Sequence, residues 1–119
     1  MRWVFLVNLA CLLTLAKDLG IQVIAFTFFR SAGDQLFEFN QGRSRTLKSL
    51  HQKWLAIDLA IWDDRDDDWC VDKEEIRWSF DPRYTTLGQY WESLGGVWGG
   101  RWKDPCDPYH FEWSNEMKI

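Results

Sequence analysis

The feature that most constrains the fold is a strict alternation of side chains between residues 55 and 62. One set is aliphatic and comprises Leu55, Ile57, Leu59 and Ile61. The other set places Asp58 between the small residues Ala56 and Ala60. Because successive side chains of a strand point to opposite faces, this alternation predicts a half-buried β-strand. Asp58 then points away from the aliphatic face, and its two alanine neighbours leave space for an ion and a substrate.

The chain contains only two histidines, His51 and His110. His51 precedes Asp58 by an odd number of residues, so an unbroken strand would place the two on opposite faces. We therefore expect His51 to reach a shared ion from a turn before the strand. Two imidazoles and one carboxylate, with a coordination position left open, are a common way to hold a catalytic zinc.

The second half of this candidate site lies near the C-terminus. Pro108 fixes its own φ and favours a bend, which would bring Asp107 near a metal held by His110. His110 and Glu112 are expected to share one face of a short strand, with aromatic residues on the other face. Cys106 is a rival ligand, because a soft thiolate also suits zinc.

Taken in order along the chain, these residues resemble the family of zinc D-Ala-D-Ala carboxypeptidases and L-alanyl-D-glutamate endopeptidases, which includes single-domain phage endolysins. The shared pattern is Ser-x-His, six residues, then Asp, with a later Asp-x-x-His. The likeness extends to the flanking segments Phe29-Arg30-Ser31, Gly42-Arg43-Ser44 and Val97-Trp98-Gly99-Gly100-Arg101-Trp102. Each motif is short, but the ordered set, spread over roughly residues 20 to 113, is much more specific.

The resemblance implies an α+β fold of the hedgehog/DD-peptidase-like kind, with helices packed on one side of a small antiparallel sheet. Residues 1–119 would then form a single zinc peptidase domain, which we expect to be a monomer. The implied zinc ligands are His51, Asp58 and His110. Cys106 ranks below Asp58, because a cysteine ligand is not in the family pattern.

The resemblance also implies catalytic roles for Asp107 and Arg30. Asp107 would take a proton from water and pass it to the leaving amine. Arg30 would stabilise the oxyanion of the tetrahedral intermediate, although a surface ion pair with Asp34 is the alternative. Zinc would polarise the scissile carbonyl and lower the pKa of water. Since zinc needs uncharged imidazoles, activity should fall in acid.

The implied substrate is the stem peptide of bacterial peptidoglycan, cut at either L-Ala–D-Glu or D-Ala–D-Ala. The phage-like C-terminal half favours the endopeptidase and a lytic role. Such an enzyme would be made in the host cytoplasm and would need a holin or a similar route to the cell wall.

Two other classes of function remain open. A glycan-cleaving lysin would use paired carboxylates such as Glu92 and Asp107. A non-catalytic zinc-binding module would keep the ion without turnover. Trp54 is the feature that keeps the module open. The family usually has glycine at this position, and a glycine there suggests close backbone approach or an unusual φ.

The composition bounds the class of protein further. The 119 residues suffice for one domain, and an aromatic content of 17% with nine tryptophans predicts a core made largely of indole and phenyl groups. A formal charge of −4 and a pI near 5.1 argue against a nucleic-acid binder. The three cysteines are an odd number without a paired motif, which indicates a reduced, cytoplasmic site of synthesis.

Residues 3–16 form a strongly apolar run between Arg2 and Lys17. The run is shorter than the roughly 20 residues that span a bilayer, and its outline fits a secretory signal only loosely. We interpret it as a core helix that ends near Gly20. The stripe at helical spacing comprises Phe5, Leu6, Leu9, Leu12, Leu13 and Ala16.

The remaining elements follow from local patterns. We expect strands over 21–29 and 76–80, a short helix over 32–41, and a second helix over 85–94. Thr85 or Thr86 would cap that second helix. The acidic run over 63–75 is interpreted as a solvated loop, because Trp69 occupies the position where a calcium loop demands glycine.

Overall fold

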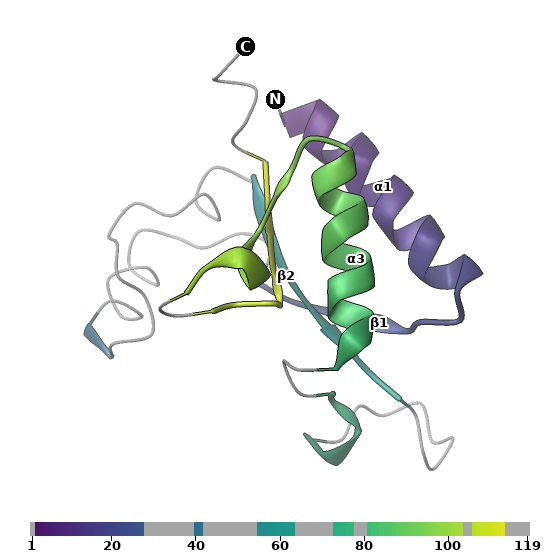
Figure 1. Ribbon diagram of the computed structural model, residues 1–119, viewed down its shortest axis with the longest axis vertical. Coiled ribbons are helices and arrows are strands. Elements are labelled where there is room, and N and C mark those ends of the chain that lie inside the picture. The colour runs from purple at the N-terminus through teal and green to yellow at the C-terminus, as the bar shows by residue number, and fades with distance from the viewer. Residues whose placement is uncertain are drawn as a thin grey trace.

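The computed structural model describes residues 2–27, 40–41, 55–63, 73–77, 81–103 and 106–113. Within these ranges, two long helices pack beside a four-stranded antiparallel sheet (Figure 1). The helices are α1 (Arg2–Asp18) and α3 (Pro82–Ser93). The strands are β1 (Val23–Thr27), β2 (Ala56–Ile61), β3 (Val97–Trp98) and β4 (His110–Glu112). Short 3₁₀ turns lie at η2 (Lys73–Glu75) and η3 (Gly99–Arg101). The expected α+β class is confirmed.

The sheet has the order β1-β2-β4-β3, so β2 lies between β1 and the C-terminal strand β4. The register of β2 against β4 pairs Asp58 with His110 and Ile57 with Phe111. Side chains that lie opposite each other in an antiparallel pair share one face of the sheet. The polar pair therefore faces one side and the apolar pair the other, as the alternation along β2 predicts.

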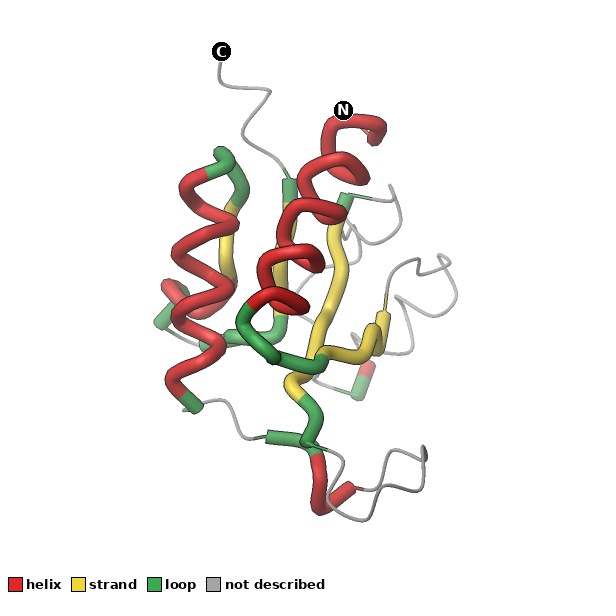
Figure 2. Tube along the Cα trace, turned by 90° about the vertical axis from the view of Figure 1, so that its right-hand side faces the viewer, coloured by secondary structure: helices red, strands yellow, loops and turns green. Residues whose placement is uncertain are grey.

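Both helices lie on the same side of this sheet, and in Figure 2 they stand in front of its strands. Residues of both helices and of the strands form one buried apolar cluster. The core combines leucine and isoleucine side chains with an aromatic cluster around the fully buried Trp91 of α3. Its indole meets Phe5, Phe111 and Trp113 edge to face, with ring centroids 5.7, 6.2 and 5.5 Å away. These edge-to-face pairs add to the free energy gained from burial alone. Indole and phenyl rings thus form part of the described core, beside a larger number of aliphatic residues.

Helix α1 is part of this core, as the apolar run predicts. Its buried residues are Phe5, Leu9, Leu12 and Ala16, and Gly20 follows the helix with a φ of 73°. Leu6 and Leu13, which the predicted stripe included, are 42% and 39% exposed. The stripe is narrower than predicted because only one edge of α1 meets α3 and the sheet. In the described part of the chain, no helix is both long and apolar enough to cross a membrane.

Helix α3 begins earlier than the sequence patterns suggest. Its N-cap is Asp81, whose Oδ1 accepts a hydrogen bond from the backbone N–H of Arg83 at 3.0 Å, and Pro82 occupies the first turn. The expectation that Thr85 or Thr86 caps the helix is therefore wrong. An Asp-Pro pair suits a helix start as well as a turn, because proline has no N–H to leave unsatisfied there.

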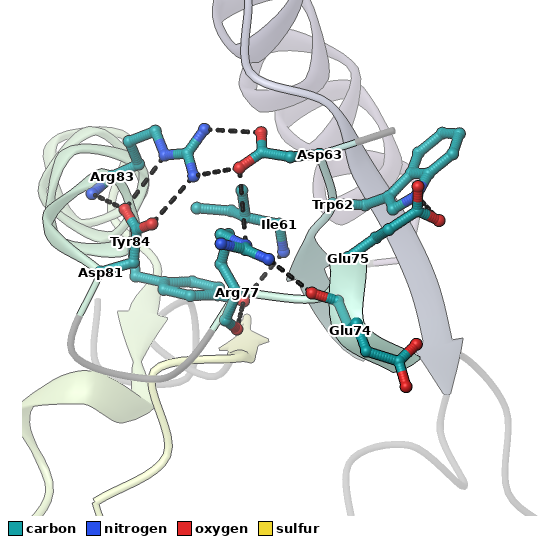
Figure 3. A network of polar contacts seen from close by, with 9 residues as sticks. All are labelled: Ile61, Trp62, Asp63, Glu74, Glu75, Arg77, Asp81, Arg83 and Tyr84. Atoms are coloured by element: carbon teal, nitrogen blue, oxygen red, sulfur yellow. Dashed lines mark hydrogen bonds and ion pairs between the residues drawn. The ribbon is translucent and has the colours of Figure 1, made fainter. Parts of the chain in front are cut away.

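The end of β2 is joined to the start of α3 by a polar network (Figure 3). The Arg83 guanidinium donates to both oxygens of Asp63 at 3.0 Å and to both oxygens of Asp81 at 2.8 and 3.0 Å. The Tyr84 hydroxyl accepts from the last backbone N–H of β2 and donates to the carbonyl of Arg77, each at 2.9 Å. The network fixes the C-terminal end of the strand that carries Asp58.

Acid is expected to weaken this network. The hydrogen bonds and charge of Arg83 hold the pKa of both Asp63 and Asp81 below the usual range. The stabilisation is therefore present above the unfolded-state pKa of about 3.9 and is lost as the pH falls through the lower folded-state values. Because both carboxylates are partly exposed, we expect a loss of about 1 kcal/mol or less.

Urea unfolding between about pH 2 and pH 6 measures this loss. The matched variant Arg83→Met removes the cation, so part of the pH dependence should disappear with it. An unfolding free energy with the same pH dependence in both proteins would contradict the role of Arg83.

Two predicted elements lie largely outside the described residues. They are the short helix over 32–41 and most of the acidic run over 63–75. The end of that run forms η2, and Ile76 makes an isolated antiparallel bridge to Trp62, at the start of the predicted strand over 76–80.

Candidate metal centre

The sheet brings three predicted site residues together. One ligand atom from each of Asp58, Asp107 and His110 lies within 4.8 Å of the others. Asp58 comes from β2, whereas Asp107 and His110 flank the turn that leads into β4. The chain thus joins two distant segments into one group of potential ligands, through the register of β2 against β4.

Asp58 is half-buried at the centre of β2, with a side chain that is 18% exposed. Its neighbours Ala56 and Ala60 are fully buried. The space that we expected at these two alanines is therefore not an open surface. Among the three potential ligands, Asp58 and Asp107 are partly exposed, whereas His110 is buried.

The bend before β4 is fixed by backbone contacts and one buried indole. The backbone N–H of Asp107 donates to the carbonyl of Gly99 at 3.0 Å, and that of His110 donates to the carbonyl of Asp107 at 3.2 Å. Nε1 of Trp98 donates to the carbonyl of Pro108 at 2.8 Å. The predicted bend at Pro108 is confirmed, and it places Asp107 beside His110.

His110 is held on both edges and on one face of its ring. Nδ1 lies 3.1 Å from Oδ1 of Asp58, and Nε2 lies 2.8 Å from Oε1 of Glu112. The indole of Trp102 packs on the ring, with centroids 5.0 Å apart and planes tilted by 41°. His110 is only 8% exposed, so the ring has little freedom to turn.

The two carboxylates determine the charge of His110. Burial lowers the pKa of the imidazole, but the hydrogen bonds and charges of Asp58 and Glu112 outweigh it and raise the pKa to about 9. A positive charge is therefore favoured at this point in the sheet. A buried imidazole grouped with two carboxylates is also a donor set that zinc accepts, so the residues present fit a divalent cation.

The other predicted site residues are placed as follows. Arg30, His51 and Trp54 lie outside the described residues. Cys106 is exposed, its Sγ lies 3.5 Å from the carbonyl of Gly100, and it does not belong to the group of potential ligands. Glu92, proposed for a glycan-cleaving lysin, accepts hydrogen bonds from Arg101 at 2.9–3.2 Å. Glu92 is therefore engaged in an ion pair with Arg101.

Three residues that support the site belong to a segment that resembles the family, but the sequence alone assigns them no role. Trp98 holds the bend, Gly99 packs against it, and Trp102 covers the ring of His110. The available signal was the Trp-Gly-Gly run, since paired glycines indicate close backbone approach. A Cβ on Gly99 would overlap the carbonyl oxygen of Asp107 and would lie 3.0 Å from Cβ of His110.

Gly99→Ala is therefore expected to displace the bend and weaken metal binding. The carbonyl oxygen of Asp107 belongs to the backbone, so it cannot move aside without shifting Asp107 and His110. We expect zinc affinity to fall by about 10-fold or more, as for loss of an outer-shell partner. Competition with a chromophoric chelator measures this. The control Gly20→Ala adds a Cβ in open space, where the strain comes only from a φ of 73° and lies on another element. Equal zinc affinities in wild type and Gly99→Ala would contradict the prediction.

Comparisons with known proteins show which family this chain resembles. The family model described as D-alanyl-D-alanine carboxypeptidase matches residues 42–113. The chain is 26% identical over 103 residues to the L-alanyl-D-glutamate peptidase of Listeria phage A118. That match covers 87% of this chain and 34% of the relative, so the chain spans about a third of the relative's length.

Two solved structures share the fold. The L-Ala D-Glu endopeptidase ChiX of Serratia marcescens aligns with a TM-score of 0.60 and 22% identity, over 82% of this chain and 71% of that one. The vancomycin resistance D,D-pentapeptidase VanY, solved with Zn(II), aligns with a TM-score of 0.56 and 16% identity, over 97% and 75%. The family model covers more than half of the chain, including Asp58, Asp107 and His110. The chain belongs to the D-alanyl-D-alanine carboxypeptidase family.

Proposed function

We propose that this chain is a zinc peptidase that hydrolyses the stem peptide of bacterial peptidoglycan. The observation that carries the proposal is the group formed by Asp58, Asp107 and His110, with ligand atoms within 4.8 Å of one another. This group occurs in a chain whose family is described as D-alanyl-D-alanine carboxypeptidase. His51 completes the ligand set that the sequence predicts.

The relatives favour one bond over the other. The phage relative is named L-alanyl-D-glutamate peptidase, and the Serratia structure is an L-Ala D-Glu endopeptidase. We therefore propose the L-Ala–D-Glu bond as the substrate, with the D-Ala–D-Ala bond as the alternative. By the same likeness, the protein acts on the cell wall as a phage endolysin does, after release from the host cytoplasm. We propose that residues 1–119 act as one domain and as a monomer.

Each residue of the site has a distinct role in the proposed reaction. Asp58, His110 and the predicted ligand His51 would hold zinc, which supplies a Lewis acid for the scissile carbonyl and makes water more acidic. Asp107 removes a proton from the attacking water and delivers it to the leaving amine. Arg30 stabilises the oxyanion.

The buried position of His110 supports this division of roles. Its ring is held between Asp58 and Glu112 and is covered by Trp102, so it is fixed as a ligand requires. Asp107 is only half-buried and lies at the start of the bend that leads into β4. A general base has to reach the water and the leaving group, and the partly exposed carboxylate meets that need better than the buried imidazole.

Digestion of purified peptidoglycan by the zinc-loaded protein tests the proposal. We expect new amino groups to appear, and the residue that carries them identifies the bond: D-Glu for the endopeptidase, free D-Ala for the carboxypeptidase. Removal of zinc with a chelator should stop the release, and added zinc should restore it. New reducing ends would instead indicate a glycan-cleaving enzyme. Bound zinc without any product would indicate a non-catalytic zinc-binding module.

A further inference from the structure

We propose that Glu112 is a positioning residue that accepts a hydrogen bond from the Nε2–H of His110 and thereby presents Nδ1 to the metal. The proposal rests on zinc binding at this site, as part of the proposed function, and adds a residue outside the predicted ligand set. It also assigns Glu112 a role other than that of a general base.

The two ring nitrogens of His110 face different surroundings. Nδ1 faces Asp58, at 3.1 Å, and Asp58 belongs with Asp107 to the group of potential ligands. Nε2 faces Glu112, at 2.8 Å, and Glu112 does not belong to that group. The metal side of the ring is therefore the Nδ1 side, and the side away from the metal is occupied by a carboxylate.

Glu112 is itself fixed in place. It lies two residues after His110 on β4, so both side chains share one face of the sheet. Its backbone pairs with Ala56 of β2 on one side and Val97 of β3 on the other, and its carbonyl accepts from Nε1 of Trp91 at 3.0 Å. Its side chain is only 16% exposed, so the carboxylate has little room to leave the imidazole.

With the Asp58 carboxylate bound to the metal, this arrangement selects one tautomer of the ligand, because only the carboxylate of Glu112 is then left to accept an imidazole N–H. A neutral imidazole carries one N–H, and a carboxylate beside Nε2 stabilises the form with the proton there. The lone pair is then on Nδ1, where the metal needs it. The same hydrogen bond makes the ligand nitrogen more basic, and loss of such an outer-shell partner typically costs about 10–100-fold in metal affinity.

Zinc affinity, measured by competition with a chromophoric chelator, separates this role from others. We expect Glu112→Leu, which removes the acceptor at similar size, to bind zinc about 10–100-fold more weakly. Glu112→Gln keeps an acceptor oxygen and should recover much of that loss. The matched control Glu74→Leu removes an exposed carboxylate from η2 and should bind zinc like the wild type. Wild-type affinity in Glu112→Leu would overturn the proposal.

A histidine-selective ¹⁵N spectrum of the zinc-loaded wild type provides a second measurement that needs no variant. With only two histidines in the chain, the ring nitrogens are readily assigned. We expect a protonated Nε2 of His110, with its proton protected from exchange, and an unprotonated Nδ1 shifted by the metal. The reverse assignment, with the metal on Nε2, would overturn the proposal even if Glu112→Leu did not fold.

Neither the zinc affinity nor the ¹⁵N spectrum depends on peptide hydrolysis. Failure of the role of Glu112 can therefore be distinguished from failure of the proposed peptidase activity. The expected affinities and spectrum in a protein that leaves peptidoglycan intact would support the role of Glu112 and reject the peptidase. A wild-type protein that binds no zinc would reject both.

Discussion

Asp107→Asn is expected to lower the rate of peptidoglycan hydrolysis by at least about 100-fold, because asparagine cannot act as a base near neutral pH. Zinc content and thermal stability should stay close to those of the wild type. The backbone contacts that Asp107 makes with Gly99 and His110 do not involve its side chain. Asparagine keeps the shape of the side chain, so the bend should survive the substitution.

The measurements are single-turnover hydrolysis, elemental zinc and thermal unfolding on the same preparation. Asp18→Asn, at an exposed position near the end of α1, is a control for loss of a carboxylate and should leave the rate unchanged. If Asp107→Asn loses zinc, Asp107 is a ligand and Asp58 needs another role. If it keeps both zinc and full activity, another group is the base.

Substitution of a zinc ligand should abolish hydrolysis too, but through loss of the metal. His110→Ala and Asp58→Ala are each expected to lose zinc, and the sequence predicts the same for His51→Ala. The loss of affinity should exceed the roughly 10–100-fold that removal of an outer-shell partner costs, because a direct bond to the metal is removed. Hydrolysis should disappear together with the zinc.

Elemental analysis after dialysis against a weak chelator measures this loss. Cys106→Ala is the matched control, since the exposed thiol was the rival ligand, and it should keep zinc. Stoichiometric zinc in the His51, Asp58 and His110 variants would rule out the assignment. Loss of zinc in Cys106→Ala would instead make the thiol a ligand.

Part of the fold could be predicted because its signals are local. The alternation over residues 55–62 predicts the faces of β2, and the helical spacing of Phe5, Leu9, Leu12 and Ala16 predicts the buried edge of α1. The start of α3 could not be predicted in this way, since Asp81-Pro82 suits both a turn and a helix N-terminus. Which edge of a helix meets its neighbours is a tertiary property, so Leu6 and Leu13 could not be excluded from the stripe.

The candidate site, too, could be predicted only in part. Residue types and spacing predicted Asp58, Asp107 and His110, and the structure brings these three together. The spacing could not predict that Asp58 lies opposite His110, because the pairing of strands that are distant in sequence depends on the whole core. The hydrogen bond from Trp98 to the carbonyl of Pro108 could not be predicted for the same reason. In a chain with many tryptophans, the sequence does not indicate which group accepts from a given indole N–H.

The pairing of β2 with β4 has a consequence for the lifetime of the protein. Asp58 and His110 are 52 residues apart, so a cation bound to both cross-links two segments whose closure costs entropy. A metal that binds only the folded chain adds about 4 kcal/mol to the free energy of unfolding when its concentration is 1,000 times the dissociation constant. Zinc supply would then determine how long the chain resists proteases as well as how fast it reacts. A zinc-starved cell would accumulate less of the protein.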